Sequence, residues 1–239
     1  MSRKKGTLYL IPTTLGKTPE NNTIPEYTLE VLRSLDVLIV ENIQTAVKFL
    51  QWVGNTIPDY KIRFYELNKK TPGQEVFSFL KPLKQGDNAG LLSEAGAPAV
   101  ADPGAVLIRM AHQNDIPVVP LVGPSSILLA LMSAGFNGQS FTFHGYLPID
   151  SNARKRAVSE LELESRKLDR TQIFMEAPHR NNEMLKDILR TCSDDVRLSV
   201  AADLTLPGEY IRSMTIAEWK KTRKPDLHKR PCLFLIYAK

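Results

Sequence analysis

Residues 91–104, LLSEAGAPAVADPG, decide how the fold of this chain is interpreted. They begin as an apolar segment and break into a loop of small residues that ends in Asp-Pro-Gly. Small residues allow backbone N–H and C=O groups to approach a ligand closely. Open α/β sheets bind ligands beyond the carboxyl ends of their parallel strands, where such a break is expected. The segment therefore predicts a small-molecule site, and the alternative is a tight connection without a ligand.

Short apolar segments alternate with helical segments through the first half of the chain, which favours a parallel sheet. The expected strands are residues 7–12, 37–40, 62–65, 89–92 and 116–122, and the expected helices begin at Pro25 and cover 45–53, 74–84 and 106–113.

In the second half the expected strands and helices follow a different order, which is typical of an α+β arrangement. Its expected strands are 141–146, 172–175, 198–202 and 233–237, and its expected helices are 127–134, 153–168 and 182–191. We place the boundary near Leu121. This gives an N-terminal α/β domain of residues 1–121, with a mostly parallel sheet flanked by helices, and a C-terminal α+β domain of residues 122–239.

Composition narrows the class of protein. The chain has 239 residues, of which 43% are hydrophobic, and no apolar run approaches the roughly 18 residues of a membrane span. The first residues lack the apolar core of a signal peptide. Two cysteines and four scattered histidines predict neither a disulfide framework nor a metal site. We therefore expect a cytoplasmic protein with no membrane or metal partner.

The net charge of +5 permits a nucleic-acid partner. Basic residues gather at 154–156 with 166, 167 and 170, and again between 220 and 230. Polyanion binding is one interpretation of these clusters, and solvated helix faces are the other. The usual nucleotide signatures are missing, because no G-x-G-x-x-G follows a strand and the Gly-Lys-Thr at 16–18 lacks the first glycine of a P-loop.

Three motifs in order carry a resemblance over nearly the whole chain. Residues 93–98, SEAGAP, match a Ser-Asp-Ala-Gly-Thr-Pro loop, and residues 176–180 read EAPHR without change. The opening 6–13, GTLYLIPT, matches an N-terminal strand. The chain resembles the tetrapyrrole methylases, S-adenosylmethionine-dependent methyltransferases with a non-Rossmann fold. Within them it is most similar to the branch that methylates a cytidine ribose 2′-hydroxyl of small-subunit (16S) ribosomal RNA.

The resemblance implies a two-domain fold with S-adenosylmethionine in the cleft between the domains. It also implies a homodimer and small-subunit ribosomal RNA as partner. The cofactor would be held by residues of the loop 93–104, called the signature loop below, of the segment that opens the next helix, and of a strand end in the second domain. These are Ser93, Ala95, Gly96, Pro98, Ala101, Asp102, Gly123, Ser125, Ser126, Met175, Glu176 and Ala177.

Methyl transfer to a ribose hydroxyl benefits from a positioned proton acceptor. The candidates are Glu41, Glu66, Glu176 and His179, of which Glu41 and Glu176 follow apolar strands. Arg180 is suited to a phosphate. Helix capping and a local ion pair are the alternative interpretation of residues 176–180.

Departures from the family pattern concern the substrate. Residues 40–44, VENIQ, replace Ala-Glu-Asp-Thr-Arg, and three cationic family positions are now Gln44, Ala202 and Leu206. We expect substrate contacts from Lys17, Asn42, Asn68, Arg180 and Asp203. Methylation of a small molecule such as a tetrapyrrole is one alternative to ribosomal RNA. A non-catalytic RNA-binding or ribosome-assembly role is the other.

Overall fold

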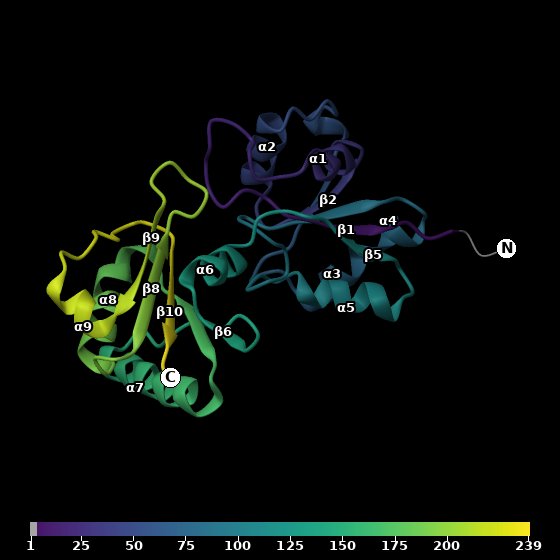
Figure 1. Cartoon of the computed structure of the whole chain (residues 1–239). Coiled ribbons are helices and arrows are strands. Elements are labelled where there is room, and N and C mark those ends of the chain that lie inside the picture. Colours follow the sequence, from purple (N-terminus) through teal and green to yellow (C-terminus); the bar gives the residue numbers. More distant parts are fainter. Residues whose placement is uncertain (1–3) are drawn as a thin grey trace. The chain divides into compact units, whose positions relative to one another are not determined.

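The computed structural model describes residues 4–239, which divide into two compact units (Figure 1). The first unit ends at Ser125 and the second covers Ser126–Lys239. The predicted domain boundary at Leu121 lies just before this division. Within the described residues, no helix is long and apolar enough to cross a membrane.

The first unit is built on a parallel sheet, as predicted. Its strands are β1 (Leu8–Ile11), β2 (Val37–Val40), β3 (Arg63–Glu66), β4 (Ala89–Leu92) and β5 (Val118–Pro120). All neighbours pair in parallel, in the order β3-β2-β4-β1-β5. The carboxyl ends of the five strands therefore lie at the same edge of the sheet.

Helices cover both faces of this sheet. They are α1 (Glu26–Arg33), α2 (Ile43–Trp52), α3 (Gly73–Ser78), α4 (Leu80–Lys84) and α5 (Ala105–Gln113), with a short η1 (Asp59–Lys61) before β3. The side chains of β2 show how the faces divide. Val37 and Ile39 pack into a core with α3, α4 and α5, whereas Leu38 and Val40 pack into a core with α1 and α2. A strand that is buried on both faces has a continuous apolar sequence. For this reason β2 was predicted with its observed bounds.

The single helix predicted over 74–84 is wrong, because the chain forms α3 and α4 with Phe79 between them. Pro82 explains the interruption. It has no backbone N–H, so it cannot donate the helical hydrogen bond to the carbonyl of Ser78.

The direction in which successive strands are added to the sheet reverses once, and we call this point at the carboxyl edge the reversal of chain direction. After β1 and β2 the chain moves toward the β3 edge, whereas after β4 it moves toward the β5 edge. Because β4 lies between β2 and β1, the loops that follow these three strands diverge from neighbouring positions. Open α/β sheets bind their ligands in the crevice that such a reversal leaves.

The second unit is α+β, as predicted. Its strands are β6 (Phe141–Tyr146), β7 (Thr171–Met175), β8 (Arg197–Ala202), β9 (Tyr210–Thr215) and β10 (Cys232–Tyr237), in the order β6-β7-β10-β8-β9. Only β6 and β7 pair in parallel. Its helices are α6 (Ser126–Ala134), α7 (Ser151–Leu168), α8 (Asn181–Thr191) and α9 (Ile216–Lys221), with η2 (Pro178–Arg180) before α8.

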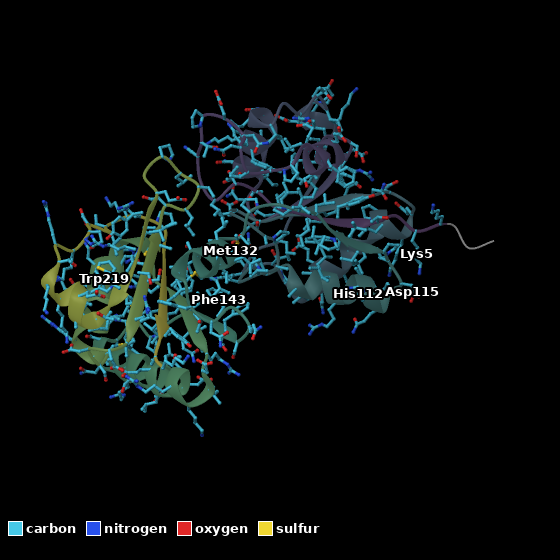
Figure 2. The ribbon with its side chains drawn as sticks, in the orientation of Figure 1. Lys5, His112, Asp115, Met132, Phe143 and Trp219 are labelled. Atoms are coloured by element: carbon cyan, nitrogen blue, oxygen red, sulfur yellow. The ribbon has the colours of Figure 1, made fainter. Side chains whose placement is uncertain are left out.

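One core joins α7, α8 and α9 to this second sheet. Trp219 is completely buried in it, and its indole N–H donates to the carbonyl of Leu198 at 2.9 Å (Figure 2). Helix α6 contacts β9 and β10. Sequence reasoning missed β9 and α9, although Thr215 and Glu218 form a capping box at the start of α9.

The first basic cluster is largely neutralised within the second unit. Arg154 is buried, and its Nε lies 2.8 Å from Oδ2 of Asp187, which is also buried. Arg166 pairs with Asp195, and Arg170 pairs with Glu164 at 3.2 Å. The positions of these three arginines therefore do not support polyanion binding.

Breaking the buried pair should be costly, because it leaves an uncompensated charge in the core. We expect D187N to lower the free energy of unfolding of the second unit by about 3–5 kcal/mol. E183Q removes the exposed Glu183–Lys186 pair of the same helix and should cost less than about 1 kcal/mol. Urea titration followed by Trp219 fluorescence in a W52F background measures both. Equal effects of the two variants would contradict this account.

Candidate active site at the sheet edge

The signature loop of the first unit is tied to the loop that follows β1. Thr13 and Gly96 exchange two backbone hydrogen bonds, of 3.0 and 3.2 Å. The hydroxyl of Ser93 donates to the carbonyl of Gly96 at 2.7 Å, and the hydroxyl of Thr13 donates to the carbonyl of Ser93 at 3.2 Å. The loops after β1 and β4 are thus held side by side.

The same loop has an unusual backbone. Gly96 has φ +76°, and a Cβ there would lie 3.0 Å from Leu15 Cδ2. Ala99 and Ala101 both have φ +64°, a region that costs alanine about 1–2 kcal/mol per residue. Strain of this kind gathers at sites where backbone groups are held for a ligand.

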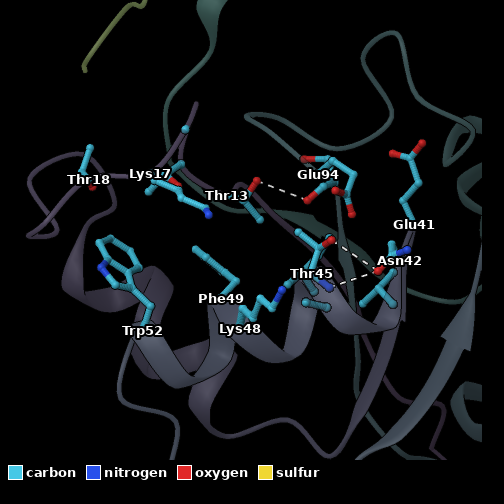
Figure 3. A pocket seen from close by; sticks show the side chains of 16 residues that line it. Thr13, Lys17, Thr18, Glu41, Asn42, Thr45, Lys48, Phe49, Trp52 and Glu94 are labelled. Carbon is cyan, nitrogen blue, oxygen red and sulfur yellow. Dashed lines mark hydrogen bonds between the residues drawn. The ribbon is translucent and has the colours of Figure 1, made fainter. Parts of the chain in front are cut away.

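A pocket of about 450 Å³ lies at the reversal of chain direction (Figure 3). Its walls are the loop 13–18 after β1, the end of β2 with α2, and the end of β4. Figure 3 shows Phe49 and Trp52 at one end of the pocket and Glu41 and Glu94 at the other. The volume is in the range of small-molecule sites.

Carboxylates gather at the acidic end of this pocket. Burial, followed by the charges of Glu41 and Glu94, raises the pKa of Asp102 from 3.8 to about 6, and Lys69 partly offsets the rise. Burial and the charge of Glu41 also raise the pKa of Glu94, and the Thr45 hydroxyl opposes this shift. Glu41 and Asp102 face a small cavity that adjoins the pocket. No group of three or more His, Cys, Asp or Glu side chains among residues 4–239 could hold a metal ion.

The predicted cofactor residues of the first unit occupy the signature loop and the segment after β5. Ser93, Gly96 and Pro98 are buried, whereas Ala95 and Ala101 are exposed. Beyond β5 stand Gly123 and Ser125. A Cβ on Gly123 would lie 2.4 Å from Pro12 Cβ, so only glycine allows this approach to the loop after β1.

The remaining cofactor candidates belong to the second unit. Ser126 is the first residue of α6, and Met175, Glu176 and Ala177 stand at the end of β7. Their contact with a cofactor stays a prediction.

Two of the proton-acceptor candidates already accept hydrogen bonds from other side chains. The side-chain amide of Asn68 donates to Glu66 Oε1 at 2.8 Å. Glu176 is buried, and its Oε1 accepts from Arg180 Nη2 at 2.6 Å. The local ion pair that was the alternative interpretation of residues 176–180 is therefore present. His179 is exposed on η2. Glu41 alone of the four candidates lines the pocket.

The predicted substrate residues are divided between the pocket and other parts of the chain. Lys17 and Asn42 line the pocket. Asn42 also caps α2, with Oδ1 accepting from the backbone N–H of Thr45 at 3.0 Å. In the second unit, Asp203 accepts from Arg230 Nε at 2.6 Å.

Sequence reasoning missed the wall formed by α2. Thr45, Phe49 and Trp52 follow Asn42 at helical spacing and line the pocket together with Lys48. The spacing 42, 45, 49, 52 places these residues on one side of a helix, and this was the available signal.

Comparisons with known proteins identify the family. The family described as Tetrapyrrole (Corrin/Porphyrin) Methylases matches residues 8–220. The chain belongs to this family, and it is an S-adenosylmethionine-dependent methyltransferase.

Relatives with similar sequences carry a more specific name. A protein of Escherichia coli O157:H7 named ribosomal RNA small subunit methyltransferase I is 32% identical over 226 residues, which are 95% of this chain and 75% of the relative. A Vibrio cholerae protein of the same name is 34% identical over 88% of this chain and 69% of its own length.

Solved structures support the fold. The methyltransferase CobJ covers 97% of this chain and 94% of its own, with a TM-score of 0.63 and 12% identity. The cobalt precorrin-4 methyltransferase CbiF gives a TM-score of 0.60 at 15% identity, over the same shares of the two chains.

Ionisation of Asp102 should destabilise the folded first unit. Folding raises the pKa of Asp102 from 3.8 to about 6. The stability that protonated Asp102 contributes to the folded unit is therefore complete below about pH 4, and it is lost as the pH rises through about 6. We expect E41Q to lower the pKa of Asp102, measured from the carbon-13 shift of its carboxyl group. E66Q is the control and should leave it unchanged. A wild-type pKa near 4 would refute the account.

Relief of the loop strain should stabilise the chain. We expect A101G to raise the free energy of unfolding by about 1 kcal/mol, because glycine adopts positive φ without the Cβ clash. A157G, in the interior of α7, should lower it by about 1 kcal/mol. Denaturant titration measures both changes, and destabilisation by A101G would show that the loop is unstrained.

Proposed function

We propose that this methyltransferase modifies the 2′-hydroxyl of a ribose in small-subunit ribosomal RNA. The pocket at the reversal of chain direction carries the proposal. It places Glu41 and Lys17 beside the signature loop of the family. The names of the relatives from Escherichia coli and Vibrio cholerae support ribosomal RNA as the acceptor.

The residues of the first unit fit S-adenosylmethionine. When bound, it supplies an electrophilic methyl group on a sulfonium cation. The carboxyl groups of Glu94 and Asp102 would complement this cation, because a positive charge beside a carboxyl group favours its ionised form. The positive-φ backbone at Ala99 and Ala101 presents N–H and C=O groups that are not used in a helix or strand. These groups would hold the polar ends of the cofactor.

Glu41 is the proton acceptor that we assign. A ribose hydroxyl is a poor nucleophile, and a carboxylate within reach would take the proton that the hydroxyl loses, a contribution of about 10²–10⁴-fold in rate. Glu41 lines the pocket, and its carboxylate forms no ion pair with any residue from 4 to 239. Glu66 and Glu176 hold other partners.

The positive charges near the pocket favour RNA over an uncharged acceptor. Lys17 and Lys48 line it, and Lys69 lies close enough to Asp102 to influence its pKa. Phosphates of a polynucleotide would be attracted by these ammonium groups. We further propose that the chain acts in the cytoplasm as a homodimer.

A methyl-transfer assay tests the proposal directly. Small ribosomal subunits from cells that lack this chain should accept the labelled methyl group of S-adenosylmethionine, and mass spectrometry of the digested RNA should place it on a ribose. Large subunits should accept none. E41Q should slow transfer by about 10²–10⁴-fold.

E66Q is the matched control and should keep the wild-type rate. A label on a base, or no transfer to small subunits, would refute the proposed reaction. A wild-type rate for E41Q would refute only the assignment of the proton acceptor.

A further inference from the structure

Helix α2 presents an unusual combination of side chains to the pocket. Asn42, Thr45, Phe49 and Trp52 recur every three or four residues, so they share one side of the helix. Leu50 is completely buried and points into the core below. The pocket wall is thus polar at the amino end of α2 and aromatic at its carboxyl end.

The aromatic end has the form of a stacking surface. The ring centroids of Phe49 and Trp52 lie 6.1 Å apart, with 28° between the ring planes. Both side chains pack against the core but are only half-buried, so part of each ring faces the pocket. The exposed part is suited to a flat, apolar ligand group.

Two ammonium groups and an orphaned hydroxyl surround this surface. Lys17 and Lys48 are exposed, and within residues 4–239 neither forms an ion pair. Figure 3 shows Lys17 extending toward Phe49. The hydroxyl of Thr18, in the wall of the pocket, is buried without a hydrogen-bond partner. Buried polar atoms of this kind are usually hydrogen-bonded, so a ligand in the pocket that Thr18 lines would supply the missing partner.

We propose that this pocket binds one unpaired nucleotide of a single-stranded RNA segment. The base stacks on Phe49 and Trp52, the flanking phosphates lie at Lys17 and Lys48, and the ribose faces Glu41. This inference rests on the proposed function, and it adds the conformation in which the RNA must be presented. A base inside a duplex cannot reach such a surface, so the nucleotide must be splayed out of its helix.

The two tryptophans of the chain make the occupancy of the pocket measurable. Trp52 lines the pocket, whereas Trp219 is completely buried in the second unit. We expect a five-nucleotide oligocytidylate to quench the tryptophan fluorescence of the wild-type protein. In W52F the quenching should vanish, while anisotropy of a labelled oligonucleotide should show affinity within about threefold of wild type, because phenylalanine also stacks.

Alanine variants measure the stacking and charge contributions. F49A and W52A should each weaken oligonucleotide binding by about 5- to 150-fold, and K17A and K48A should each reduce the salt dependence of log K by about 0.7. Y60A and K81A, exposed and outside the pocket, are the matched controls and should bind as wild type. The wild-type quenching needs no variant and keeps the test valid if W52A is unstable.

Two results would overturn the inference. One is oligonucleotide binding without quenching, or with unchanged affinity in folded F49A and W52A. The other is quenching of Trp52 by S-adenosylmethionine alone, with competition by the oligonucleotide, which would make the pocket the cofactor site. Failure of the proposed function looks different, because the oligonucleotide would then quench Trp52 although no methyl group reaches ribosomal RNA.

Discussion

The two backbone hydrogen bonds between Thr13 and Gly96 are the constraint on which the site depends. They join loops whose strands are neighbours but whose chains leave toward opposite edges of the sheet. Loops that diverge in this way would separate without such a tie. Because only glycine tolerates the required φ of +76° beside Leu15, these two hydrogen bonds depend on a single residue.

This tie gives the pocket two ends of opposite character. At one end, burial raises the pKa of Asp102 and of Glu94, and the nearby charge of Glu41 adds to both shifts, because like charges held close disfavour ionisation. At the other end, aromatic rings and exposed ammonium groups create a surface for a flat group that carries negative charge. A substrate with an apolar face, an anionic backbone and a hydroxyl to deprotonate complements both ends at once.

Sequence reasoning succeeded where burial alone determines the pattern. The fully buried strands β2 and β4 were predicted with their observed bounds, because a strand covered on both faces has no polar interruption. It missed β9, a half-exposed edge strand without apolar alternation. It also counted Arg154 as a surface charge, since nothing local shows that Asp187 lies opposite it. The signature loop was predicted from its small residues, whereas the aromatic wall of α2 was not, because half-buried rings on a helix resemble ordinary core positions.

The cap of α2 has a consequence for how such a site can diversify. Asn42 stands where the related branch carries an aspartate, yet its Oδ1 still accepts the N–H of Thr45 that starts the helix. Either side chain can make this bond, so a full negative charge can be gained or lost at the rim of the pocket while the helix keeps its start. The charge at position 42 can therefore change without loss of the hydrogen bond that starts α2. Descendants of one scaffold can drift toward acceptors of different charge by single steps, each of which leaves the protein folded.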